Sequence, residues 1–354
     1  MGMNTSRNIV AAIILLGIVA IGVSSAQWKP LKPNPADRTK PSDGSDAQEA
    51  IVTDSGAVIS MDVRVVNVLA SVRDKSGRYV NGLTKDDFIL KEDGKRQDIR
   101  YFSAESNLPL TLGLIIDVSV SQENLLEEER RAAQAFIEQV IGEKDLAFVI
   151  SFGPDTRLEQ DLTSSQNLLA RSLQRLQIRG ASYSPVTPGT NPTSTPRGTV
   201  LFDAVYLAAK EMLRPVVGRK AIILITDGID QGSKVDIQEA LKEAHLSDVV
   251  VYSILHYDSS FHGPFSRGTA DYDLGKMAKE TGGTLFKPKR NQPLSEIFRE
   301  IQDELRNQYS IGFTPANTNE DGRFRTIDLS ITRKGLKVQT RRGYYASGQQ
   351  DESQ

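Results

Sequence analysis

An aspartate and two serines alternate in the segment DVSVS, which holds Asp117, Ser119 and Ser121. A spacing of two residues allows the three side chains to converge on one side of a turn. A carboxylate and two hydroxyls are hard oxygen ligands, which suit Mg²⁺, Mn²⁺ or Ca²⁺ rather than zinc or copper. Three ligands are too few for six coordination positions, so further ligands have to come from elsewhere in the chain.

Two more oxygen-bearing residues stand at comparable places in the sequence. Thr199, in RGTVLFDA, precedes a predicted helix, and Asp227, in AIILITDGID, follows an apolar run that predicts a buried strand. Asp117 also follows such a run. Because ligands of open parallel sheets bind at the carboxyl ends of the strands, we expect both aspartates at one edge of a sheet. The sequence therefore predicts a site of two carboxylates and three hydroxyls, with room for a ligand from outside.

Simpler roles compete with this interpretation. Asp117 and Ser119 could act only in a turn and a helix cap. Asp203 is expected to be an acid favoured by a helix dipole, and Asp230 to be part of a turn. Glu123 is expected to face solvent, with a contribution to the potential of the site as the alternative. Only the joint occurrence of the five candidate residues favours a metal site.

The region 108–307 alternates short apolar runs with helical patterns, which predicts an α/β fold with a mostly parallel central sheet and helices on both faces. The predicted strands cover residues 112–116, 146–152, 221–226, 249–255 and 284–286. The predicted helices cover residues 124–141, 166–176, 200–213, 235–246, 273–281 and 294–307. Asn124 is expected to cap the first of these helices.

The flanks of this region follow the period of two that is typical of strands. The pattern of residues 58–105 predicts one half of a small β-unit. The alternation of apolar and polar residues changes phase near Val65, as a β-bulge would produce. Residues 308–346 predict strands that complete this unit, so the α/β domain would be inserted into a small β-sandwich. Residues 347–354 are expected to be a disordered tail. The loop 181–197 is rich in Pro, Ser, Thr and Gly, and we expect disorder there, with a functional loop as the alternative.

The first residues have the features of a secretion signal. Arg7 precedes an apolar run of about 15 residues, and small residues then end at Ala26. The run is shorter than the roughly 20 residues of a spanning helix, so residues 1–26 predict a cleaved signal peptide. An uncleaved anchor is the alternative and would be the one contact with a membrane. Residues 27–57 are polar and rich in Pro, and predict a flexible linker.

The composition excludes several classes of function. A net charge of −2 without a basic cluster gives no reason to expect nucleic acid as a partner. The absence of cysteine among the 354 residues excludes disulfides, a thiolate nucleophile and a Cys-ligated zinc. His256, Asp258 and His262 do not have the spacing of a standard metal site.

These motifs resemble the metal-ion-dependent adhesion site (MIDAS) of von Willebrand factor A (VWA) domains. The resemblance rests on DVSVS, on GT before a helix and on ITDG at the end of a strand. The flanking segments GLTKDDFILKEDGKRQDI, YSIGFTP and TRRGYYA look like those of the exported bacterial VWFA-related subfamily. The resemblance thereby extends to most of the mature chain, which is expected to begin at Gln27.

The resemblance implies a role for each candidate. Ser119 and Ser121 would bind the metal directly, and Thr199 would bind it when a partner is present. Asp117 and Asp227 would act through water. The metal would be a divalent cation, with Mg²⁺ favoured and Mn²⁺ and Ca²⁺ as alternatives. The open position would take a carboxylate from a partner protein.

We therefore expect an exported, non-enzymatic protein-binding module, located in the periplasm, at the cell surface or outside the cell. The alternative is a structural envelope protein with an incidental or degenerate metal site. An enzyme is less favoured, because the chain has no Walker A loop, no G-x-S-x-G and no HExxH. A phosphatase of the haloacid-dehalogenase kind would need a second aspartate where Ser119 stands.

Overall fold

The computed structural model describes residues 50–52, 58–60, 65–104, 108–180, 198–258, 266–289 and 292–346. The predicted signal peptide, most of the predicted linker, residues 61–64 on the N-terminal side of the predicted bulge, the 181–197 loop, His262 and the 347–354 tail lie outside these residues. The chain divides into two units, residues 1–61 and 62–354. In the first unit, β1 (Ala50–Val52) and β2 (Val58–Ser60) form an antiparallel pair.

The second unit contains a central sheet of six strands in the order β12-β11-β10-β7-β8-β9. Its strands are β7 (Leu110–Asp117), β8 (Leu146–Phe152), β9 (Thr156–Thr163), β10 (Arg219–Thr226), β11 (Val249–Leu255) and β12 (Leu285–Phe286). All neighbours are parallel except β8 and β9, which are antiparallel. The prediction of a mostly parallel sheet is confirmed.

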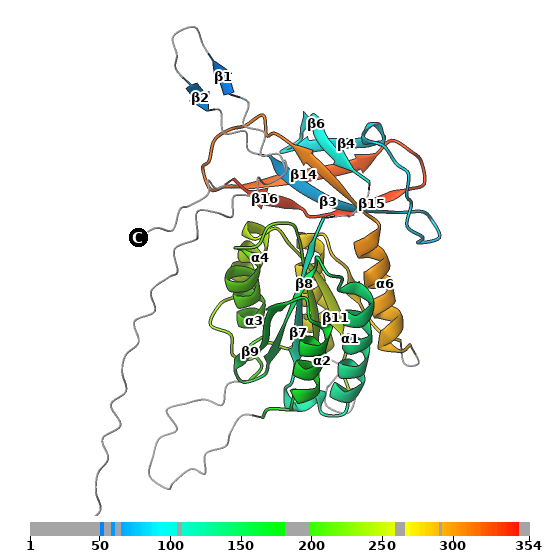
Figure 1. Cartoon of the computed structure of the whole chain (residues 1–354), viewed down its shortest axis with the longest axis vertical. Helices are drawn as coiled ribbons and strands as arrows, with labels where there is room; N and C mark the ends of the chain where they lie inside the picture. The colour runs from blue at the N-terminus through cyan, green and yellow to red at the C-terminus, as the bar shows by residue number, and fades with distance from the viewer. Residues whose placement is uncertain are drawn as a thin grey trace, which may run out of the picture. The chain divides into compact units, whose positions relative to one another are not determined.

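Helices cover both faces of this sheet (Figure 1). The helices are α1 (Leu126–Val140), α2 (Gln166–Arg175), α3 (Leu201–Leu207), α4 (Ile237–Leu246), α5 (Ser266–Thr281) and α6 (Leu294–Arg306). Helices α1, α2 and α6 pack on one face, and α3, α4 and α5 pack on the other. A π-helical stretch, Ala208–Leu213, continues α3.

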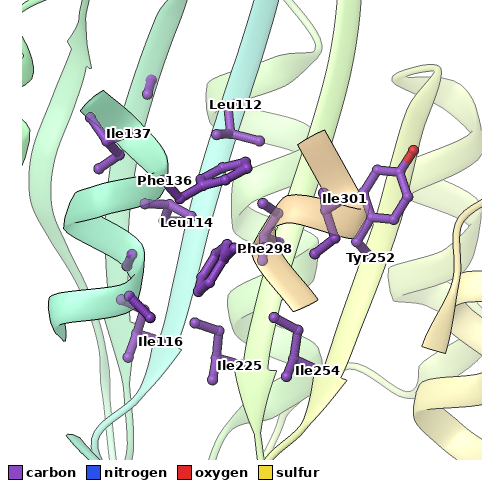
Figure 2. Packing of buried hydrophobic residues seen from close by; sticks show 14 of the residues in the cluster. Leu112, Leu114, Ile116, Phe136, Ile137, Ile225, Tyr252, Ile254, Phe298 and Ile301 are labelled. Atoms are coloured by element: carbon purple, nitrogen blue, oxygen red, sulfur yellow. The ribbon is translucent and has the colours of Figure 1, made fainter. Parts of the chain in front are cut away.

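The alternation of side chains along β7 explains why this strand is buried on both faces. Leu112 and Leu114 point into the cluster that Figure 2 shows, where Phe136 of α1 and Phe298 of α6 place their ring centroids 4.9 Å apart. Ile115 belongs to the cluster on the opposite face. Each fully buried side chain of this size contributes about 1.5–3 kcal/mol, so β7 is firmly held up to its last residue.

Two antiparallel sheets of four strands flank the central fold. One has the order β15-β3-β13-β6 and the other the order β16-β14-β4-β5. Their strands are β3 (Val66–Arg73), β4 (Phe88–Glu92), β5 (Lys95–Gln97), β6 (Ile99–Ser103), β13 (Gln308–Phe313), β14 (Phe324–Ile331), β15 (Lys337–Thr340) and β16 (Gly343–Tyr345). Because β3 pairs with β13 on one side and with β15 on the other, N-terminal and C-terminal strands share each sheet. The predicted insertion of the α/β region between them is confirmed.

Several local predictions were wrong. Asn124 does not cap α1: Leu125 holds that position, and the Asn124 side chain donates to Asp258 at 2.8 Å. The antiparallel edge strand β9 was missed. Helix α5 begins at Ser266, seven residues before the predicted start. The predicted helix 200–213 is α-helical only as far as Leu207.

A candidate cation site at the carboxyl edge of the central sheet

Two neighbouring parallel strands end in an acid at the same edge of the sheet. Strand β7 ends at Asp117, and β10 is followed directly by Asp227; the register pairs Ile116 with Ile225. Asp117 is fully buried, and Asp227 is 4% exposed. The two aspartates therefore lie at the same edge of the sheet, as the sequence predicts.

The loop after β7 brings both serines to these acids. A carboxylate oxygen of Asp117 accepts a hydrogen bond from the Ser119 backbone N–H at 2.9 Å. The hydroxyls of Ser119 and Ser121 lie 3.0 Å apart, and Ser121 donates to the Asp227 carboxylate at 2.5 Å. A short 3₁₀ turn, Val120–Gln122, follows and holds Ser121 in the loop. Hydrogen bonds thus join four of the five predicted residues in one network.

Thr199 reaches the same edge through its backbone. It is 9% exposed and directly precedes Val200, whose N–H donates to the carbonyl of Gly153, at the end of β8, at 2.9 Å. The Thr199 carbonyl accepts from the N–H of Gln231, in the loop after Asp227, at 2.9 Å. Within the described residues, no hydrogen bond joins the Thr199 hydroxyl to the other four side chains. Thr199 is therefore close to the network but is not part of it.

Thr226 is a member of the network that the sequence analysis missed. Its hydroxyl donates to the second carboxylate oxygen of Asp117 at 2.6 Å and accepts from the N–H of Gly228 at 3.0 Å. Gly228 has φ of +80°, and a Cβ there would meet the Ala270 side chain at 2.7 Å, so the turn requires glycine. The signal was available, because Thr226 directly precedes the predicted ligand in ITDG.

Burial and like charge both act on the two carboxylates. Burial raises the pKa of Asp117 to about 7, and the charge of Asp227 adds to this effect. Hydrogen bonds from Ser119 and Thr226 to Asp117 act in the opposite direction. No Lys, Arg or His within the described residues forms an ion pair with Asp117. A bound divalent cation would offset both the repulsion and the cost of burial, and the oxygen donors present fit such an ion.

The neighbouring polar residues have separate partners. His256 lies 2.7 Å from Glu129 of α1, and its backbone N–H donates to the Thr226 carbonyl at 2.9 Å. Burial raises the pKa of Glu129, whereas the contact with His256 lowers it. Asp258 accepts from Asn124. Within the described residues, no group of three or more His, Cys, Asp and Glu could hold a metal, so a cation at this edge depends on hydroxyl ligands.

The simpler roles predicted for three acids agree with the structure. Glu123 is exposed. Asp203 lies in the first turn of α3, where a helix dipole favours an acid, and also accepts hydrogen bonds from the backbone N–H groups of Lys234 and Val235. Asp230 accepts from Ser233, three residues on. None of the three lies in the hydrogen-bonded network around Asp117.

The sequence model of the von Willebrand factor type A domain matches residues 112–300, slightly more than half of the chain. The chain belongs to the VWA domain family. VWA domains are typically interaction or adhesion modules without catalysis, and they often bind a divalent cation at a MIDAS. None of the curated proteins matches the chain in sequence.

Several solved structures are similar to this VWA chain. BatB from Bacteroides thetaiotaomicron, a conserved hypothetical protein, is 18% identical with a TM-score of 0.40; the match covers 55% of this chain and 97% of BatB. A von Willebrand factor type A protein from Catenulispora acidiphila is 14% identical with a TM-score of 0.45, over 71% of each chain. Proximal thread matrix protein 1 from the mussel byssus, with a zinc-occupied MIDAS motif, is 13% identical with a TM-score of 0.44, over 59% of this chain and 48% of that one.

Within the described residues, no helix has the length and apolar character needed to cross a membrane.

Proposed function

We propose that this VWA protein is an exported, cation-dependent protein-binding module. A divalent cation, with Mg²⁺ favoured, would be held at the network of Asp117, Ser119, Ser121 and Asp227. The observation that carries the proposal is this convergence of two carboxylates and two hydroxyls at one edge of the sheet. Export is inferred from the apolar N-terminal run alone.

The ligand set leaves the cation electrophilic. Ser119 and Ser121 would contribute neutral hydroxyls, and Asp117 and Asp227 would act through water. Thr199 would add its hydroxyl when the partner binds, for which its position beside the network is suitable. An anionic oxygen from outside would then supply much of the missing charge, so an acidic side chain of a partner protein is the expected ligand.

The loop that carries the serines is accessible to such a partner. Val120, between the two serines, is 47% exposed, whereas Asp117 beneath it is fully buried. An exposed apolar side chain beside the cation would contact the residues that flank the partner's acid. Buried acids with an exposed rim are a suitable arrangement for a binding site.

Calorimetric titration of Mg²⁺ and Mn²⁺ tests the site. The protein is expected to bind one ion saturably, and Asp117→Asn is expected to abolish this binding. Asp203→Asn is the matched control, because Asp203 is an acid of the same domain that lies outside the network. Equal binding by the wild type and Asp117→Asn would refute the site.

Partner capture tests the second half of the proposal. Capture from envelope extracts is expected to require the cation, to disappear in EDTA and to fail with Asp117→Asn. A partner retained equally in EDTA would contradict binding through the metal. The chain would then fit a structural envelope protein better.

A further inference from the structure

A cavity of about 740 Å³ lies away from the cation site, on the flanking strands. The end of β3, the middle of β14, strand β15 and the loop after α5 line it. Val338 is partly buried and gives the cavity apolar surface, whereas Ile327 and Leu329 of the lining are 8% and 6% exposed and pack in the core of the flanking sheets. The volume of the cavity is within the range of small-molecule sites in proteins.

The charge around this cavity is strongly positive. Its lining includes two acids, Asp74 and Asp328, and six basic residues. The basic residues are Arg73, Lys75, Lys279, Lys337, Arg341 and Arg342. This excess contrasts with the chain as a whole, whose net charge is −2.

The three arginines already have carboxylate partners. Arg73 binds the buried Glu304 at 2.8 Å, Arg341 pairs with Asp248, and Arg342 lies 3.4 Å from Glu280. They hold the walls of the cavity in place.

The two acids of the lining are also engaged by basic residues outside it. Arg78 donates to Asp74 at 3.1 Å, and Lys91 lies 3.9 Å from Asp328. Neither acid therefore neutralises a lysine of the cavity.

Lys75, Lys279 and Lys337 remain without a carboxylate partner in the described parts of the chain. They come from three separate elements: the turn after β3, the last turn of α5 and the start of β15. The Lys75 side chain lies against the turn between β14 and β15, because a Cβ on Gly335 would be 3.2 Å from its Cε. Packing thus directs Lys75 toward the turn that precedes Lys337. The three ammonium groups are exposed and border one cavity, so an anion in it would be attracted by all three.

We propose that this cavity binds a ligand with two or more phosphate groups. Lysine binds phosphate as a compact point charge, and three lysines on separate walls match an anion whose charges are spread over several groups. Val338 would contact the remainder of the ligand. None of the described residues that line the cavity is aromatic, so a stacked nucleic-acid base is not favoured.

Calorimetric titration of inorganic triphosphate into the full chain tests this proposal. EDTA is present, so the result does not depend on the cation site. Each of Lys75→Gln, Lys279→Gln and Lys337→Gln is expected to weaken binding about threefold, which is typical of exposed charge pairs. The triple variant is expected to weaken it about thirtyfold. Lys95→Gln, on the edge strand β5 and outside the cavity, is the matched control and is expected to bind as the wild type does.

Two results would overturn the proposal: no binding of triphosphate at millimolar concentration, or equal binding by the triple variant and Lys95→Gln. Asp117→Asn is expected to bind triphosphate normally, so a failure of the cation site remains distinguishable. Binding to vesicles of phosphatidylcholine and cardiolipin, a lipid with two phosphates, distinguishes a lipid headgroup from a free phosphate ligand. Vesicle binding that the triple variant loses indicates a lipid headgroup, and triphosphate binding without vesicle binding indicates a free ligand.

Discussion

Arg73 donates a hydrogen bond to Glu304 at 2.8 Å, although 231 residues separate them in the sequence. Arg73 ends β3 of the flanking sheets, and Glu304 lies in α6, which packs on the central sheet, so the pair connects the two parts. Glu304 is fully buried and also accepts from Tyr79 at 3.1 Å and from Thr284 at 3.3 Å. One carboxylate thus joins the N-terminal strands to the inserted domain.

Glu304→Gln is expected to destabilise the protein by about 2–3 kcal/mol, because it leaves Arg73 without its counter-charge in a partly buried position. Denaturant unfolding measures the loss. Glu300→Gln, an exposed position one turn earlier on α6, is the control and is expected to change stability by less than about 0.5 kcal/mol. Equal stability of the two variants would show that the connection contributes little.

Mg²⁺ is expected to raise the melting temperature of the wild type by about 3–5 °C at ten times its dissociation constant. The shift arises because the cation binds only the folded site and relieves the repulsion between Asp117 and Asp227. Asp117→Asn is expected to lose the shift, and Asp203→Asn to keep it. Scanning calorimetry with and without Mg²⁺ provides the measurement. A shift that persists in Asp117→Asn would place the cation elsewhere.

Thr226→Val is expected to cost about 1–3 kcal/mol, because the buried Asp117 carboxylate and the Gly228 N–H each lose a hydrogen-bond partner. It is also expected to weaken Mg²⁺ binding, since Asp117 is no longer fixed in orientation. Thr226→Ser keeps the hydroxyl and is expected to restore both properties. Unfolding curves and calorimetry measure the two effects. A valine variant as stable as the serine variant would show that the hydroxyl has no such role.

The elements that could be predicted from the sequence have patterns that are visible locally. The buried strands β7 and β10 are continuous apolar runs that end in an acid, and the fold then determines that Asp117 and Asp227 meet. The alternation of apolar and polar residues in 58–105 and in 308–346 likewise predicted two sets of strands. Neither set could bury a core alone, so the two were expected to pair with each other. These predictions depended on period and composition, which the tertiary structure did not override.

The wrong and missing predictions concern residues whose structure depends on contacts with residues far away in the sequence. Asn124 has the residue type of a helix cap, but its side chain instead binds Asp258, 134 residues away. Strand β9, with the sequence TRLEQDLT, lies at the sheet edge, so it needs few apolar residues and gives little periodic signal. The pair of Glu129 and His256 joins residues 127 positions apart, and no local pattern indicates it.

His245 of α4 packs against Phe324 and Tyr345 of the flanking strands, with ring centroids 5.1 and 6.3 Å away. Burial and, to a smaller extent, the nearby positive charge of Arg341 lower the pKa of His245 to about 4, and Asp248 partly opposes this shift. In the unfolded chain the pKa is close to 6.5, so protons bind the unfolded state more strongly. This contribution to stability is complete above about pH 6.5 and is lost as the pH falls toward 4, by about 3 kcal/mol in total.

Asp117 changes the stability with pH in the opposite direction, because its pKa is raised on folding. The difference in unfolding free energy between the wild type and His245→Phe, measured from pH 7.5 to 4.5, therefore isolates the histidine. That difference is expected to shift in favour of the phenylalanine variant as the pH falls, and a constant difference would show that His245 is not buried in its neutral form.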